Sequence, residues 1–239
     1  MRRHAVALLC FMLGYSLSVW SQKLSTTGEK ALSFFTRLEA QDFDAYLKRT
    51  RLPKVSAEVK AAALKQLAHE EILTPTEKTQ AQLLTLRPLL KYHERGDVLD
   101  IKILNRGEAF IGFQGRAVLL ISQPALSILS VEELQAAVAH ELGHEYFWHE
   151  MMAAQKQKQE EVRRELELRS DAIAVIALHR LGGNPAHLIA AITRVRTFNA
   201  RLGLTDSPHH PLLPERIGFI RAMSELVKVR ANGKGEGSL

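Results

Sequence analysis

The chain has 239 residues, of which 46% are hydrophobic and 24% are charged, with 14 Gly and 8 Pro. This composition supports one sizeable globular domain, or two small ones, and excludes a disordered chain, a collagen-like fibre and a disulfide scaffold. No apolar run reaches the roughly 20 residues that a membrane-spanning helix needs, so a polytopic membrane protein is excluded. The net charge of +6 is scattered along the chain without a nucleic-acid-binding motif. We therefore expect no nucleic-acid partner.

The first 21 residues have the pattern of a secretory signal peptide. Basic residues at Arg2 and Arg3 precede an apolar run over residues 5–19, and cleavage is expected after Ser21. This predicts a periplasmic or secreted protein. The alternative is an uncleaved membrane anchor, although such a helix would extend only about 22 Å across a hydrocarbon core of about 30 Å. We expect membrane contact only in that case.

The rest of the chain divides into three predicted regions. Residues 22–97 show apolar residues at helical spacing, interrupted by prolines, and predict an N-terminal helical region. Residues 98–230 begin with two strand-like runs, 98–104 and 117–121, and continue with helical patterns. Residues 231–239 predict a flexible tail. The expected fold class is therefore α+β and mostly helical, with a short sheet packed on helices.

Residues 140–144 read His-Glu-Leu-Gly-His, the HExxH pattern. Ser130 and Glu133 form a capping box that begins the helix carrying this pattern. Residues four apart share one face of a helix, so His140 and His144 can bind the same zinc ion. Glu141 then lies beside the metal, where its carboxylate can accept a proton from a zinc-activated water. The sequence therefore predicts one Zn²⁺ per chain.

A tetrahedral catalytic zinc needs a third protein ligand. The metzincin solution is excluded because Phe147 and Glu150 stand where that class has Gly and His. Glu167 is the candidate, since Asp171 follows it four residues later and can orient a ligating imidazole. Three other acids compete with Glu167 but have no Asp four residues later, namely Glu160, Glu161 and Glu165.

This ligand set requires a chain reversal that the sequence does not mark. No Gly or Pro occurs between Gly143 and Gly182, so the segment resembles one uninterrupted helix. On a straight helix His140 and Glu167 would lie about 40 Å apart, too far to share an ion. We therefore predict that the chain reverses within residues 151–162, near residues 155–159.

Residues 98–225 resemble the HtpX-like and BepA-like zinc metallopeptidases, relatives of the CAAX prenyl proteases within the gluzincins. The similarity includes the segment from Glu132 to His144, the pair formed by Glu167 and Asp171, and the segment His-Pro-Leu-Leu-Pro-Glu-Arg-Ile at residues 210–217. The resemblance implies a zincin-like domain whose short sheet packs on the HExxH and ExxxD helices. It also implies that His140, His144 and Glu167 bind zinc, that Glu141 is the base, that Asp171 orients a ligand, and that His210 and Arg216 lie near the active site.

The sequence also departs from this family. Residues 108–115 replace the usual strand-turn segment before the metal helix, which puts the turn and the substrate groove in doubt. The membrane-spanning helices of the HtpX and prenyl-protease relatives are absent, as is a tandem helical repeat. The expected protein is therefore a minimal, exported catalytic domain.

The leading functional hypothesis is an exported zinc metalloendopeptidase that cleaves peptides or proteins of the cell envelope. We expect an extended peptide to add to the sheet edge near residues 117–122 by main-chain pairing. One alternative is a zinc-retaining chaperone-like or binding protein of the envelope with latent or absent proteolysis. A second alternative is a basic surface protein that binds anionic envelope components through residues 29–95.

Overall fold

The computed structural model describes residues 24–38, 43–205 and 207–232. The predicted signal peptide, residues 1–21, lies outside the described residues. The fold is α+β and mostly helical, as the sequence predicts. The helices of the N-terminal half are α2 (Thr26–Arg37), α3 (Phe43–Thr50), α4 (Ala57–Gln66), α5 (Glu77–Leu84), α6 (Arg87–Tyr92) and α7 (Gln123–Ile128). Those of the C-terminal half are α8 (Val131–His144), η1 (Glu145–Phe147), α9 (Trp148–Lys156), α10 (Glu160–Arg180), α11 (Ala186–Arg201) and α12 (Leu213–Asn232).

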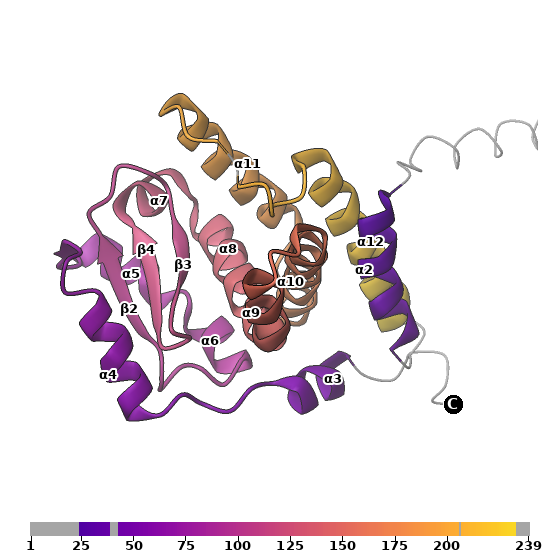
Figure 1. Cartoon of the computed structure of the whole chain (residues 1–239), viewed down its shortest axis with the longest axis horizontal. Coiled ribbons are helices and arrows are strands. Elements are labelled where there is room, and N and C mark those ends of the chain that lie inside the picture. Colours follow the sequence, from indigo (N-terminus) through magenta and orange to yellow (C-terminus); the bar gives the residue numbers. More distant parts are fainter. Residues whose placement is uncertain (1–23, 39–42, 206, 233–239) are drawn as a thin grey trace, which may run out of the picture.

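The N-terminal region, residues 22–97, is helical as expected where it is described, and it also contributes a strand. The two-residue strand β1 (Ile72–Leu73) pairs with β2 (Asp100–Leu104) from the following region. Helix α2 packs on α10 and α12, and Phe35 and Leu47 are buried in the same hydrophobic core as the C-terminal helices. Figure 1 shows α2 and α12 side by side. The two predicted regions therefore share one core.

The sheet has the strand order β1-β2-β4-β3, with β3 spanning Ile111–Gln114 and β4 spanning Val118–Ser122. Strands β2 and β4 are parallel, whereas β1 and β3 pair antiparallel to their neighbours. The predicted edge near residues 117–122 is wrong, because β4 lies between β2 and β3. The strand at the edge beside α8 is β3, which the sequence did not predict as a strand. A Cβ at Gly112 would lie 2.6 Å from the tip of the Phe110 ring, so a larger residue there would require this ring to move.

Both faces of β4 are buried, which explains its continuous apolar sequence. Val118 and Leu120 pack against Ala63 and Leu67 of α4 in a small cluster. Leu119 and other side chains of the opposite face join the main core beneath the C-terminal helices. The sheet is therefore a layer between α4 and the helices that carry the predicted metal ligands (Figure 1).

The predicted chain reversal is confirmed. Helix α8 ends at His144, η1 and α9 follow, and the chain turns at residues 157–159 before α10 begins at Glu160. The turn is a Schellman motif: Gln159 N donates to Ala154 O (2.9 Å) and Lys158 N donates to Gln155 O (3.1 Å). Lys158 has φ +54°, the conformation that glycine adopts at this position in most such motifs.

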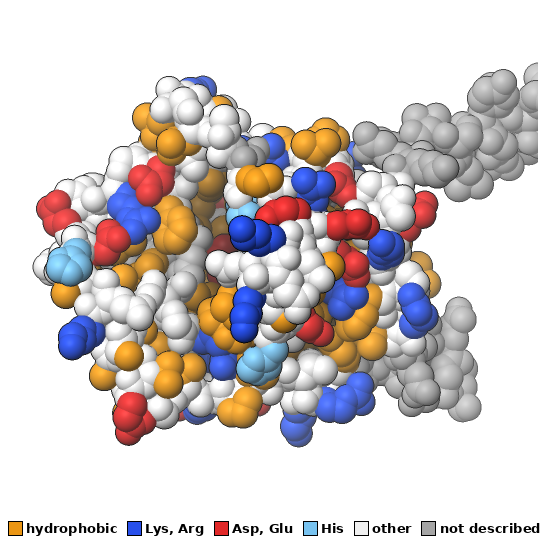
Figure 2. Space-filling model, in the orientation of Figure 1, with side chains coloured by type: hydrophobic (Ala, Val, Ile, Leu, Met, Phe, Trp, Pro, Cys, Tyr) orange, Lys and Arg blue, Asp and Glu red, His pale blue; other side chains and the backbone are white. Residues whose placement is uncertain are grey.

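The C-terminal end differs slightly from the prediction. Helix α12 continues through Asn232, so the first two residues of the predicted tail, 231 and 232, are helical. Residues 233–239 lie outside the described part of the chain. No described helix combines the length and the hydrophobicity needed to cross a membrane. Figure 2 shows basic and acidic side chains interspersed on the face that it views, in agreement with the scattered charges of the sequence.

Replacing Lys158 with Gly should stabilise the protein. A side chain in the left-handed region costs about 1–2 kcal/mol, part of which is offset by the larger entropy of Gly in the unfolded chain. We expect Lys158→Gly to raise the free energy of unfolding by about 0.5–1 kcal/mol in urea titrations. Lys156→Gly, at the last residue of α9, is the matched control and should lower it by a similar amount. The reverse order of the two variants would contradict this account of the turn.

Candidate metal centre

Helix α8, which carries the HExxH residues, has a capped N-terminus. Ser130 Oγ accepts from Glu133 N (3.2 Å), and Ser130 N donates to the Glu133 carboxylate (2.9 Å), so the predicted capping box is confirmed. Arg194 of α11 donates to the same carboxylate at 3.0 Å. These contacts anchor the first turn of α8 to its own cap and to α11.

Gly143 permits the close contact between α8 and α10 on which the centre depends. A Cβ at Gly143 would lie 2.6 Å from the carbonyl oxygen of Ser170 and 3.0 Å from its Cα. Both neighbours are backbone atoms, so the contact cannot be relieved by rotation of a side chain. The glycine within the motif therefore brings the α10 backbone against the metal helix.

Potential ligand atoms of three residues converge where the two helices meet. His140 Nε2 lies 3.1 Å from His144 Nε2 and 3.4 Å from Glu167 Oε2. His144 Nε2 lies 3.6 Å from Glu167 Oε1. Zinc bonds of about 2.0–2.2 Å in tetrahedral geometry require ligand atoms about 3.3–3.6 Å apart. The two nitrogen–oxygen distances, one to each Glu167 oxygen, lie within this range, and the nitrogen–nitrogen distance is about 0.2 Å shorter.

The partners of the other ring nitrogens determine what the three atoms can do. His140 Nδ1 lies 2.8 Å from the Asp171 carboxylate, which accepts its proton. His144 Nδ1 lies 3.1 Å from Ser170 Oγ, whose own proton is directed to Leu166 O at 3.0 Å. Each Nδ1 is therefore the protonated nitrogen, and each Nε2 of the neutral ring carries a lone pair. Two lone pairs and a carboxylate directed at one point repel each other and favour a cation there, so these residues fit zinc.

The pKa values of the two histidines are shifted in opposite directions. Burial lowers the pKa of His140, but the carboxylates of Asp171 and Glu167 outweigh burial and raise it to about 10. Burial lowers the pKa of His144 to about 4. A cation bound at the centre would replace the extra proton on His140, since ligating imidazoles are neutral.

The carboxylates of Glu141 and Glu167 differ in the direction of their pKa shifts. Burial raises the pKa of Glu141 to about 7, which is suited to accepting a proton near neutral pH. Burial also acts to raise the pKa of Glu167, but His144 and His140 outweigh it and hold the pKa well below its usual range. Oxygen and nitrogen atoms of Glu141, His140 and His144 all lie within 4.8 Å of one another. Glu141 is thus beside the predicted ligands and carries a proton-accepting group.

Arg216 is placed behind the centre. Its Nε donates to Asp171 Oδ2 at 2.9 Å and its Nη2 donates to Oδ1 at 2.6 Å. Asp171 is fully buried, and Arg216 is 7% exposed. The guanidinium therefore neutralises the carboxylate that holds His140, and its place in the structure is that of a positioning residue.

The centre lies at the floor of a cleft of about 640 Å³. The cleft is lined by residues 109–113 of the segment that includes β3, by residues of α11 and by His210. Figure 2 shows a hollow between the sheet and the α9–α10 side, with hydrophobic side chains along it. The structure thus brings together all the predicted site residues, including His210 and Arg216. A smaller recess of about 210 Å³, lined by Trp148 and His209 among others, adjoins it on the side of His144.

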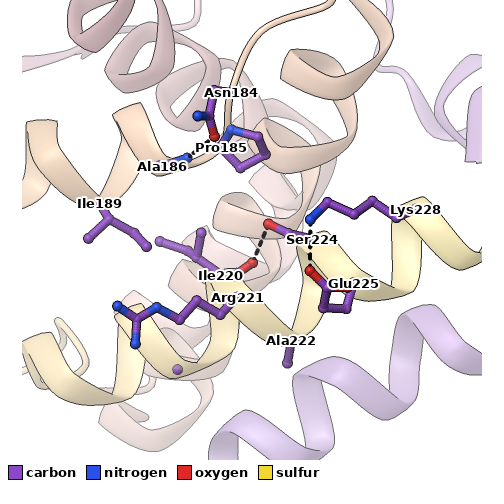
Figure 3. Close-up of a pocket in the computed structure, with 11 residues that line it drawn as sticks. Asn184, Pro185, Ala186, Ile189, Ile220, Arg221, Ala222, Ser224, Glu225 and Lys228 are labelled. Atoms are coloured by element: carbon purple, nitrogen blue, oxygen red, sulfur yellow. Dashed lines mark hydrogen bonds and ion pairs between the residues drawn. The ribbon is translucent and has the colours of Figure 1, made fainter. Parts of the chain in front are cut away.

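A larger cavity, of about 970 Å³, lies elsewhere (Figure 3). It is bounded by the start of α11, at Asn184 and Pro185, and by α12, where Lys228 pairs with Glu225. It contains none of the predicted site residues. Among the described residues, His140, Glu141 and His144 form a group whose potential ligand atoms lie within 4.8 Å of one another, and Glu167 oxygens lie closer still to the two imidazoles, at 3.4 and 3.6 Å.

Sequence reasoning missed three residues that shape the site. Ser170, which fixes the His144 ring, lies one turn after Glu167 and directly before Asp171, but serines at such positions are common. Gly143 was visible inside the motif, although nothing in the sequence identifies the backbone that it approaches. Asn199, on α11, contacts Ala109 before β3. The two residues lie 90 positions apart in the sequence, so no local pattern predicts this contact.

The comparisons with known proteins assign no family. No family model matches the chain, and no curated protein matches it. The case for a function therefore depends on the geometry of the site.

Replacing Gly143 with Ala should damage both the fold and the metal centre. The added methyl would force α8 and α10 apart, at a cost of about 1–3 kcal/mol in the free energy of unfolding. Because Glu167 and Ser170 would move with α10, zinc affinity should fall as well. Thermal unfolding with and without zinc, together with zinc titration, measures the two effects. Gly107→Ala is the control, because a Cβ there meets nothing within 4 Å. Equal unfolding temperatures and equal zinc affinities of the two variants would contradict the close-contact explanation.

Glu167 should be required for zinc binding. We expect purified wild type to hold about one zinc per chain and Glu167→Ala to bind it more than about 100-fold more weakly, beyond the range for losing an outer-shell partner. Glu165→Ala is the matched control, because Glu165 lies on the same helix but pairs with Arg169. Elemental analysis and competition with a chelator give the stoichiometry and affinity. Full zinc retention in Glu167→Ala would show that the third ligand is another residue.

Proposed function

We propose that this chain is an exported zinc metalloendopeptidase with a zincin-like domain, related to the HtpX-like and BepA-like metallopeptidases. One observation carries the proposal: His140 Nε2, His144 Nε2 and the two oxygens of the Glu167 carboxylate converge at 3.1–3.6 Å, with Glu141 beside them in an open cleft. A purely structural zinc site is closed by four protein ligands. Three ligands and a neighbouring base are the arrangement of a hydrolytic site.

The positions of the residues suggest the chemical role of each in peptide hydrolysis. When bound, zinc supplies Lewis acidity that polarises a peptide carbonyl and makes water nucleophilic at neutral pH. Glu141 accepts a proton from the attacking water and delivers it to the leaving amine. Its pKa of about 7 places it near the balance between the two protonation states, and a cation at the centre would shift it toward the carboxylate.

The remaining polar residues hold the ligands in place. Asp171, paired with Arg216, holds His140, and Ser170 holds His144. Burial lowers the pKa of His210, so the ring is neutral at pH 7. A neutral imidazole at the end of the cleft can donate a hydrogen bond to a carbonyl oxygen of a bound peptide, and we propose this role for His210.

The cleft suits an extended polypeptide. The open edge of β3 offers main-chain groups for pairing, which moves the expected site of peptide addition from residues 117–122 to residues 111–114. The facing wall carries the apolar side chains of Leu188, Ile192 and Val195 from α11. A substrate with a large apolar residue near the cleaved bond would bury it there.

Export through residues 1–21 is part of the proposal and stays a prediction. A signal peptide would place the enzyme in the periplasm or outside the cell, where envelope proteins and peptides are the available substrates. The alternative of a zinc-retaining chaperone-like protein is distinguished by the need for Glu141, because retention of zinc does not require a base.

Glu141→Gln should abolish hydrolysis and preserve zinc. The amide is nearly isosteric with the carboxylate but accepts no proton, so the rate should fall by at least about 100-fold, within the range measured for general bases. The measurement is hydrolysis of an unstructured casein by residues 22–239, with zinc content determined on the same samples. Glu150→Gln, an exposed acid on α9, is the control. Undiminished activity in Glu141→Gln would overturn the mechanism, and an envelope role that survives in that variant would favour the chaperone-like alternative.

A further inference from the structure

Asn199 makes two hydrogen bonds to a single residue next to the edge strand. Its Oδ1 accepts from Ala109 N at 2.8 Å, and its Nδ2 donates to Ala109 O at 2.9 Å. One side-chain amide thus satisfies both backbone groups of Ala109, as the peptide backbone of a neighbouring strand would. Ala109 itself is only 3% exposed.

The register of the sheet shows which edge Asn199 occupies. Ser122 N donates to Phe110 O at 2.9 Å, and Gly112 is paired with Leu120. In an antiparallel pair, successive residues direct their backbone groups alternately toward the partner strand and away from it. Residues 110, 112 and 114 therefore face β4, while Ala109, Ile111 and Phe113 direct theirs to the open edge in the cleft. Asn199 binds the first of these three outward-facing residues.

Asn199 is held firmly in this position. It lies in the last turn of α11, where its carbonyl accepts from Leu204 N at 3.1 Å in the cap that ends the helix at Gly203, φ +77°. Farther along α11, Arg194 is tied to Glu133 of the metal helix. The side chain of Asn199 is therefore part of the rigid cleft wall.

We propose that Asn199 takes the place of a substrate peptide group at Ala109 and so determines how far a substrate can pair with the edge strand. The inference rests on the proposed peptidase function. A bound peptide pairs with Ile111 and Phe113 and then has to end or turn away, because the next pairing position is filled. The favoured substrates are thus polypeptides extended over a short stretch, with a chain end or a bend beyond the residue beside Ile111.

The test is a scan of backbone N-methylation along one peptide. The peptide is taken from the wild-type digest of an unstructured casein, and each variant of it carries one N-methylated residue. An N-methyl group prevents one main-chain hydrogen bond, which should lower kcat/KM about three- to tenfold wherever the peptide pairs with the strand. In wild type, positions beside Ile111 and Phe113 should be sensitive and the position beside Ala109 insensitive. In Asn199→Ala, the peptide position beside Ala109 should become sensitive as well.

Arg194→Ala is the matched control, because it removes the hydrogen bonds between α11 and Glu133 of α8 and leaves Ala109 covered. It should keep the wild-type methylation profile. Amide hydrogen exchange at Ala109 gives a second readout, which should accelerate in Asn199→Ala and not in Arg194→Ala. Should Asn199→Ala fail to fold, Asn199→Ser keeps a polar side chain that is too short to reach both groups.

The outcomes separate the two proposals. If zinc-loaded wild type cleaves no casein, the peptidase proposal fails, and this inference fails with it. If wild type cleaves but Asn199→Ala shows the same methylation profile, Asn199 does not limit pairing, and the inference alone is overturned. A new sensitive position in Arg194→Ala as well as in Asn199→Ala would assign the limit to the placement of α11 and would also overturn it.

Discussion

The contact between Gly143 and the Ser170 backbone is the constraint on which the rest of the site depends. It brings two helices close enough for α8 to supply two imidazoles while α10 supplies the carboxylate between them and the partners that fix both rings. The arrangement concentrates electron pairs at one point, which is unfavourable in a buried site unless a cation neutralises them. The close packing of α8 on α10 therefore also sets the affinity that we predict for a metal ion.

The buried charges behind the ligands extend this arrangement through the core. Arg216 of α12 neutralises Asp171 of α10, and Asp171 holds His140 of α8, so three helices are joined by polar contacts at the level of the predicted metal ligands. A buried ion pair adds little stability compared with apolar packing, and breaking one partner leaves an uncompensated charge. The benefit of this network lies in geometry, since it sets the ring orientation that a metal requires.

The sequence predicted the parts of the site that obey local rules. The HExxH spacing and the capping box at Ser130 follow from periodicity or backbone preference, and the structure contains both of them. No glycine marks the reversal before α10, because Lys158 adopts at the end of α9 the left-handed conformation that Gly182 adopts after α10. The reversal could therefore be inferred only from the distance that the predicted ligands must span. Strand β3 and its position at the sheet edge depend on long-range pairing, which a local pattern containing Gly112 does not reveal.

The cleft shows how one wall can impose both rigidity and selectivity. Helix α11 is attached to the metal helix through Arg194 and to the segment before β3 through Asn199, so the two walls cannot separate without breaking polar contacts at both places. A fixed cleft orders little on binding and therefore loses little entropy when a peptide enters. The same attachment fills one pairing position on the edge, which removes the hydrogen bonds that a longer extended chain would gain there. Preorganisation of this centre and a short pairing register therefore have a common structural origin.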